Sequence, residues 1–307
     1  MAIGYLGPEG TFTHGAARDL CPGADLVALT TQAQAIAQVE DGAIEGAVVP
    51  IDNTVNGVVL PTWDSLLGTT ASRIVADVLV PVTFNAYALS GDVTPEVVVS
   101  HPHALAQCAR YVSSLGVPSR AASSTAEACA SLAPGEVAIA APVCAELYPV
   151  ATIATKVEDS AGAITQFGLV SRGDTVQRDN TLQRGDTLQR GDTLQRGDTQ
   201  PTTARWTTVF AALPKHNAPG SLAALLTPLE ALGCNLENIV ARPVRDSADY
   251  VFLLFVADLD QDRETAALDS LRAQCSGLSV LGRLAATKPT GSDGASGVPA
   301  RMLSVQS

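Results

Sequence analysis

Short hydroxyl and amide side chains stand at the ends of several apolar segments of this sequence. Thr165 and Gln166 precede the apolar run 167–170, which has the composition of a buried strand. Asn53 follows the apolar segment 46–50, and Ser100 closes the apolar segment 97–100. Open α/β sheets bind ligands at the carboxyl ends of their strands. We therefore expect these side chains to contribute to a ligand site.

A glycine-rich turn offers a second set of donors. Residues 7–14 read Gly-Pro-Glu-Gly-Thr-Phe-Thr-His and separate a short apolar strand from a helical stretch. Backbone N–H groups and the Thr11 hydroxyl at a helix N-terminus suit an anion. A purely structural role stays open for both sets. Glycines at a strand-to-helix corner often serve only to form that turn, and Ser100, ahead of Pro102, has the position of a helix N-cap.

The remaining ligand-type residues do not favour a metal or cofactor. His101 and His103 would share one face of an extended segment, but no further His or Cys follows at a spacing typical of a metal site. The six cysteines form no C-x-x-C pair, which indicates reduced, buried thiols. We expect neither a metal nor a cofactor.

Composition narrows the class of protein. The chain has 307 residues, 46% of them hydrophobic and 4% aromatic, and a net charge of −12. That charge argues against nucleic acid or an anionic membrane as a partner. The N-terminus lacks the basic and apolar regions of a signal peptide, and no apolar run reaches the length of a membrane helix. We expect a soluble cytoplasmic protein.

Apolar periodicity predicts alternating strands and helices over the first half of the chain. Strands are expected at 2–6, 46–50, 74–87, 97–100, 121–124 and 137–141, and helices at 15–20, 31–40, 62–67, 105–115, 125–132 and 142–147. This alternation indicates a mostly parallel α/β domain over residues 1–171, with the segment 74–87 crossing into a second lobe.

Two further changes of pattern divide the rest of the chain. Residues 172–204 repeat the unit Arg-Gly-Asp-Thr-Leu-Gln with variations and carry too few apolar side chains to fold, which predicts a flexible linker. Residues 205–285 follow the order βαββαβ of a ferredoxin-like domain. Residues 286–307 are rich in Gly, Ser, Pro and Ala and are expected to form a flexible tail.

An ordered set of motifs resembles the prephenate dehydratase family with its C-terminal ACT regulatory domain. The motifs are residues 7–12 (GPEGTF), 50–54 (PIDNT), 62–66 (TWDSL), 100–102 (SHP) with Gln107 and Cys108, 124–126 (STA), and 165–167 (TQF), where the family has Thr-Arg-Phe. The resemblance implies a two-lobed catalytic domain, similar to periplasmic binding proteins, that binds prephenate between its lobes.

The resemblance also assigns residue roles. It implies catalytic roles for Thr165, Asn53, Ser100 and Gln107, with the Thr165 hydroxyl placed to assist departure of the ring hydroxyl of prephenate. Further substrate contacts are expected from Thr11, Gln166, Phe167 and Ser124. In the ACT domain, the matching effector-site positions are Gly220, Leu222, Asn235 and Arg242.

Two sites depart from the family pattern. Gln166 replaces an arginine, so a neutral amide stands where the family has a fixed cation. Val240 and Ala241 stand where the ACT domain has Glu and Ser, which leaves open whether an amino-acid effector such as phenylalanine still binds.

Three functions follow as hypotheses. The first, favoured by Gln166, is decarboxylation of prephenate without aromatisation, toward a nonproteinogenic amino acid or antibiotic in secondary metabolism. The second is ordinary dehydration of prephenate to phenylpyruvate in aromatic amino acid biosynthesis, favoured by the retained Asn53, Ser100, Gln107 and Thr165. The third is an inactive amino-acid sensor. In each case an exposed ACT sheet predicts a homodimer or homotetramer.

Overall fold

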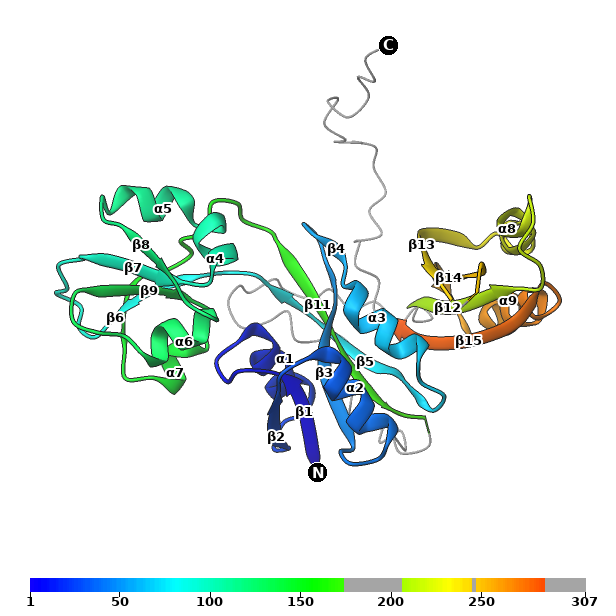
Figure 1. The fold of residues 1–307 in the computed structure, drawn as a ribbon, viewed down its shortest axis with the longest axis horizontal. Helices are drawn as coiled ribbons and strands as arrows, with labels where there is room; N and C mark the ends of the chain where they lie inside the picture. The colour runs from blue at the N-terminus through cyan, green and yellow to red at the C-terminus, as the bar shows by residue number, and fades with distance from the viewer. Residues whose placement is uncertain (174–205, 245–246, 285–307) are drawn as a thin grey trace, which may run out of the picture.

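A computed structural model describes residues 1–173, 206–244 and 247–284 of the chain. Three parts follow one another along the long axis of the molecule (Figure 1). Lobe I lies in the middle and contains residues 1–81 and 163–173, lobe II contains residues 82–162, and the C-terminal domain begins at Trp206. Most of the expected linker and all of the expected tail lie outside the described residues.

Lobe I is an α/β unit in which the sheet contains both parallel and antiparallel pairs. Its elements are β1 (Ala2–Leu6), α1 (Phe12–Leu20), β2 (Asp25–Leu29), α2 (Gln32–Glu40), β3 (Gly46–Asn53), β4 (Gly57–Val58), α3 (Leu60–Leu67), β5 (Ser72–Pro81) and β11 (Ile164–Arg172). The sheet order is β5-β11-β3-β1-β2. β1 pairs in parallel with β2 and β3, whereas β11 is antiparallel to both β3 and β5.

Lobe II is built around a separate sheet of order β10-β6-β9-β7-β8. Its elements are β6 (Asn85–Ala88), β7 (Val97–Ser100), α4 (Pro102–Gln107), α5 (Ala109–Ser114), β8 (Ser119–Ala121), α6 (Thr125–Ala130), β9 (Glu136–Ala140), α7 (Cys144–Leu147) and β10 (Ala151–Ala154). The predicted two-lobed α/β architecture is confirmed. The expectation of a mostly parallel sheet is wrong, because the two connections between the lobes, β5 and β11, pair antiparallel to each other.

Several element boundaries differ from the predictions for local reasons. The expected strand 74–87 is divided into β5 and β6, and the expected helix 105–115 is interrupted at Cys108, where φ is −118° and ψ is 26°. The strand expected to end at Pro50 continues to Asn53 because β11 and β4 pair with its polar end. The largely exposed strand β2 was not predicted, since it lacks a continuous apolar run.

The C-terminal domain has the predicted order βαββαβ. Its elements are β12 (Trp206–Pro214), α8 (Ser221–Ala231), β13 (Asn235–Pro243), β14 (Tyr250–Leu259), α9 (Gln261–Arg272) and β15 (Cys275–Leu284). The four strands are antiparallel in the order β13-β14-β12-β15. Leu225 of α8 and Leu271 of α9 share a core with one face of this sheet.

The other face of the C-terminal sheet packs against lobe I. Phe255 and Leu253 of β14 belong to the same buried cluster as Trp63 of α3 and Ile74 of β5. Gly282 of β15 pairs with Ile74, which joins the two sheets edge to edge. Lobe I and the C-terminal domain therefore share one hydrophobic core.

Candidate active site

The sheet of lobe I brings two of the predicted site residues into direct contact. Thr165 at the start of β11 lies opposite Asn53 at the end of β3, and Asn53 Nδ2 donates a hydrogen bond of 2.8 Å to Thr165 Oγ. Asn53 Oδ1 accepts from the backbone N–H groups of Val55 (2.9 Å) and Asn56 (3.0 Å). These two bonds fix the amide orientation, so the NH₂ group is the end that faces Thr165.

Both side chains are partly exposed and lie on the α1 side of the sheet. Phe167, which follows Thr165 on the same face, is buried in the cluster that contains Ala16 and Ala17 of α1. The hydroxyl of Thr165 is therefore held on one side by an amide donor while its surroundings remain open to a ligand. Phe167 itself is only 3% exposed and serves as a core residue.

Gln166 lies on the opposite face of the same sheet. It is paired with Asp52, its side chain is 3% exposed, and its Nε2 donates to Asp77 Oδ2 at 2.7 Å. Neighbouring Gly168 faces Ile51 and Ile74 of the core shared with the C-terminal domain. Because successive residues of a strand point to opposite faces, Gln166 does not share the face of Thr165, and its contact with a ligand stays a prediction.

The carboxyl of Asp52 lies on this second face as well. Burial raises its pKa above the ordinary value, and the nearby carboxylate of Glu237 on β13 raises it further. Asp52, Gln166 and Leu79 line a small recess together with Thr54 and Ile164. The polar groups around Gln166 thus face the C-terminal domain rather than the Asn53–Thr165 pair.

The glycine-rich turn of lobe I contacts lobe II through hydrogen bonds. Tyr148 Oη donates to the carbonyl of Glu9 (3.1 Å), and Cys144 Sγ donates to the carbonyl of Gly10 (3.3 Å). Gly10 has φ +86°, and an added Cβ would lie 3.0 Å from Cβ of Ala126 on α6. Residue 10 must therefore be glycine both for its backbone conformation and for this close approach.

Thr11 and Ser124 both act as helix N-caps near that contact. Thr11 Oγ accepts from the His14 N–H at 3.3 Å, and Ser124 Oγ accepts from the Glu127 N–H at 3.0 Å. Each hydroxyl thus stabilises a helix of a different lobe, α1 or α6. Both side chains are partly exposed, which leaves them accessible to a ligand.

His14 is a residue of this region to which sequence reasoning gave no role. Its Nδ1 accepts from the Gly10 N–H at 3.3 Å, and its ring lies 5.1 Å from that of Tyr5. Burial lowers its pKa, which favours the neutral imidazole. Its position four residues after Gly10 was the available signal, because that spacing on a helix start allows such a bond.

Ser100 and Gln107 belong to lobe II. Ser100 is fully buried, and its hydroxyl donates to the carbonyl of Ile139 at 2.6 Å. The alternative of Ser100 as a helix cap is wrong, since His101 is the N-cap of α4 and its Nδ1 accepts from the His103 N–H. Gln107 is the last residue of α4 and is partly exposed. The contacts described for these two residues do not include Asn53 or Thr165.

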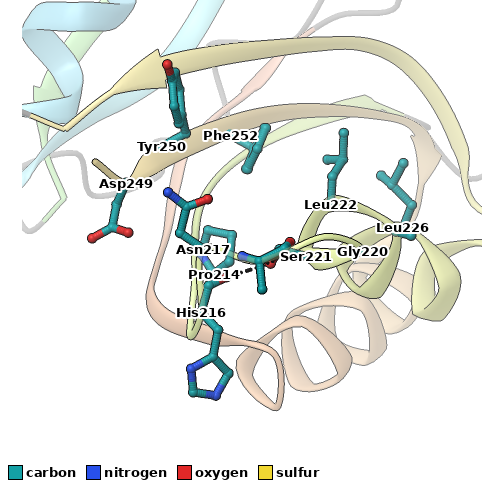
Figure 2. Close-up of a pocket in the computed structure, with 12 residues that line it drawn as sticks. Pro214, His216, Asn217, Gly220, Ser221, Leu222, Leu226, Asp249, Tyr250 and Phe252 are labelled. Atoms are coloured by element: carbon teal, nitrogen blue, oxygen red, sulfur yellow. Dashed lines mark hydrogen bonds between the residues drawn. The ribbon is translucent and has the colours of Figure 1, made fainter. Parts of the chain in front are cut away.

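A cavity of about 480 Å³ opens at the start of α8 in the C-terminal domain. Leu222 and Leu226 project from α8, Tyr250 and Phe252 come from β14, and Asn217 lies in the loop before the helix (Figure 2). The size is typical of a small-molecule pocket. Its lining combines an apolar floor with the backbone at a helix start.

The four predicted effector-site residues divide between this cavity and other places. Gly220 and Leu222 line the cavity. Asn235 is exposed at the start of β13. Arg242 instead forms a two-pronged ion pair with Asp64 of α3, in which Nε and Nη2 donate to the two carboxylate oxygens.

Metal-ligand clusters and membrane-spanning helices are both absent from the described residues. Among them, no three His, Cys, Asp or Glu side chains gather in the manner of metal ligands. None of the helices in the described ranges combines the length and apolar character needed to span a membrane.

Comparison with known proteins identifies relatives over nearly the whole chain. The family model for prephenate dehydratase matches residues 3–175, and the model for the ACT domain matches residues 216–273. A prephenate dehydratase of Amycolatopsis methanolica is 36% identical over 292 residues, which cover 92% of this chain and 88% of that protein.

Solved structures give the same fold. A prephenate dehydratase from Arthrobacter aurescens, in complex with L-Phe, has a TM-score of 0.74 at 30% identity and covers 93% of this chain and 90% of its own. A protein described as a novel type of quorum-quenching acylase has a TM-score of 0.74 at 25% identity, with 94% of this chain and 98% of that chain covered. This chain belongs to the prephenate dehydratase family and carries a C-terminal ACT domain.

Proposed function

We propose that this protein is a prephenate dehydratase that converts prephenate to phenylpyruvate, CO2 and water. The observation that supports this most directly is the hydrogen bond from Asn53 Nδ2 to Thr165 Oγ. The likeness to the dehydratase of Amycolatopsis methanolica extends over most of both chains, which favours the same reaction class.

In the proposed mechanism Thr165 acts as the general acid. The bond between the ring and its carboxylate breaks and releases CO2, the electron pair enters the ring, and the ring hydroxyl leaves as water with the proton of Thr165. The Asn53 amide donates a hydrogen bond to Thr165 Oγ. It offsets the negative charge that develops on this oxygen as the proton departs, because hydrogen bonds in a chain polarise one another. A positioned acid contributes about 10²–10⁴ in rate. Solvent returns the proton to Thr165.

The position of Gln166 supports dehydration over non-aromatising decarboxylation. The preference for decarboxylation depended on the replacement of the family's arginine by Gln166, which would remove a cation from beside the leaving hydroxyl. Gln166 instead donates to Asp77 on the other face of the sheet, so its side chain does not lie beside the Thr165 hydroxyl. The decarboxylase stays a prediction, distinguished by its product.

The product of prephenate turnover at neutral pH decides among the three hypotheses. Purified protein is incubated with prephenate, and the products are separated and identified by mass. We expect phenylpyruvate. A dihydro-hydroxyphenylpyruvate as the main product would contradict dehydration and support non-aromatising decarboxylation. Saturable prephenate binding without turnover would support the inactive sensor.

We further propose that the ACT cavity binds an amino acid. Leu226 and Phe252 offer an apolar surface for a side chain, while Ser221 and Asn217 supply polar groups near the helix start. The relative from Arthrobacter aurescens was crystallised with L-Phe, which favours L-phenylalanine as the first compound to test. Calorimetric titration should give saturable binding that Leu226→Glu abolishes. An equal affinity in that variant would exclude this cavity.

A homo-oligomer is also part of the proposal. β13 is the edge strand of the C-terminal sheet, and exposed edges favour pairing with another copy. The full chain should elute from a sizing column as a dimer or tetramer, and elution at the mass of a single chain would contradict this.

A further inference from the structure

Helix α3 lies between the ACT sheet and strand β3 of lobe I. Trp63 of α3 is fully buried, and its ring packs edge-on against Phe255 of β14 with a centroid distance of 5.2 Å and an interplanar angle of 77°. Leu66 of the same helix belongs to the shared core. The side of α3 toward the ACT domain is thus held by tight aromatic packing.

Helix α3 is also bound to strand β3 of lobe I, through side-chain hydrogen bonds. Trp63 Nε1 donates to the carbonyl of Ile51 at 3.0 Å, and Thr62 Oγ donates to the carbonyl of Pro50 at 2.6 Å. Ile51 lies two residues before Asn53, the partner of Thr165. One side chain, Trp63, therefore touches both the ACT sheet and the strand that presents Asn53.

An ion pair adds a second contact beside Trp63. Arg242 of β13 donates through two nitrogens to the carboxylate of Asp64, a geometry that fixes orientation as well as distance. Arg242 is in register with Val251 of β14, and the following pair is Pro243 with Tyr250, which lines the ACT cavity.

The cavity and α3 use opposite faces of β14. Phe252 lines the cavity and packs in the cluster on the α8 and α9 side, whereas Phe255 packs in the cluster that contains Trp63. Close-packed interiors have low compressibility. A ligand that shifts β14 must therefore also move α3 or break its contacts.

We propose that α3 is a positioning element that couples the ACT cavity to the Asn53–Thr165 pair, with Trp63 and the Asp64–Arg242 ion pair as its two contacts. The proposal rests on the proposed function for its catalytic end. Trp63 and Asp64 do not touch the reacting atoms and act by setting the position of β3. By linkage, a ligand in the ACT cavity then alters prephenate affinity, and prephenate alters the affinity of that ligand by the same factor.

Trp63 supplies a direct readout. The chain contains two tryptophans, Trp63 and Trp206, so a Trp206→Phe variant of the full chain reports on Trp63 alone. L-phenylalanine is the probe ligand. We expect its addition to change the emission of Trp63 saturably, with the same dissociation constant as calorimetry gives.

Asp64→Asn tests the ion pair. This variant keeps the shape of the side chain and removes the charge that holds Arg242. We expect calorimetric binding of L-phenylalanine to persist, while its effects on Trp63 emission and on prephenate KM each fall by about threefold or more. Asp269→Asn is the matched control, because Asp269 pairs with Arg272 on the exposed side of α9 and should leave both effects unchanged.

Three results would overturn the coupling: no calorimetric binding of L-phenylalanine, binding without a change in Trp63 emission, or equal responses in Asp64→Asn and Asp269→Asn. Failure of the proposed function gives a different pattern. In that case prephenate yields no phenylpyruvate, but Trp63 emission still responds to L-phenylalanine, and that response is weaker in Asp64→Asn.

Discussion

The Thr165 hydroxyl accepts a 2.8 Å hydrogen bond from Asn53 Nδ2, and each residue lies at the end of a different strand. Replacement by valine keeps the branched shape and removes the hydroxyl. We expect Thr165→Val to lower kcat for phenylpyruvate formation by about 10²-fold or more, as for loss of a positioned acid. Initial rates with prephenate measure this.

Serine is the matched control at position 165. Thr165→Ser keeps the hydroxyl and the acceptor for Asn53, so it should retain most of the activity. Valine and serine variants of equal activity would exclude the hydroxyl as the acid.

Gln166 offers a contrasting prediction, because it shares a strand with Thr165 but not a face. Gln166→Arg places a cation near Asp77 and Asp52. We expect the product to remain phenylpyruvate and kcat to change by less than about tenfold, which is about 1.4 kcal/mol of barrier. Product analysis of both proteins is the measurement, and a switch of product would show that residue 166 acts on the reacting ring.

At the scale of elements, the end of α2 is tied to the start of β5 through Glu40. Its carboxylate accepts from the Thr70 N–H (2.8 Å), the Ser72 N–H (2.9 Å) and the Ser72 hydroxyl (2.6 Å). The Ser72 hydroxyl and the Thr70 N–H lower the pKa of Glu40 from its ordinary value of 4.5 to about 2.

This pKa gives a stability prediction with a defined sign. The unfolded chain binds a proton at Glu40 more tightly than the folded chain does. The Glu40 carboxylate therefore stabilises the fold fully above pH 4.5, and this stabilisation is lost as the pH falls through about 2. Glu40→Gln should flatten the loss of stability across that range. Urea midpoints measured at several pH values test this, with the exposed Glu230→Gln as control. Parallel acid profiles for wild type and Glu40→Gln would contradict the assignment.

At the scale of the whole molecule, lobe I and the ACT domain meet where Gly282 pairs with Ile74. An added Cβ at Gly282 would lie 2.6 Å from Cβ of Ile74 and 3.1 Å from its carbonyl oxygen. Gly282→Ala should therefore lower the free energy of unfolding by about 1–3 kcal/mol through overpacking.

Gly277 is the matched control on the same strand. An added Cβ there would meet Leu213 at an ordinary contact distance of 3.6 Å, so Gly277→Ala should change stability by no more than about 0.5 kcal/mol. Denaturant unfolding of the two variants separates the cases. Equal effects would show that the junction does not depend on close approach at Ile74.

The two-lobed α/β architecture and the βαββαβ order of the C-terminal domain were predictable because apolar periodicity is local. The motif order also placed Asn53 and Thr165 correctly at strand ends. What periodicity missed was the strand β2, which is largely exposed, and the break at Cys108, which is buried in a core cluster of lobe II. The antiparallel pairing of β11 between β3 and β5 was not predicted, because register arises only when distant segments meet.

The sequence by itself determined the family, the residue types available for prephenate chemistry, and the departure from the family pattern at residue 166. Only the tertiary structure decided on which face of the sheet residue 166 lies. The alternation of a β-strand sends Thr165 toward α1 and Gln166 toward the core shared with the ACT domain. Thr-Gln-Phe therefore supplies one hydroxyl to the proposed active site and one amide to the opposite face of the same sheet.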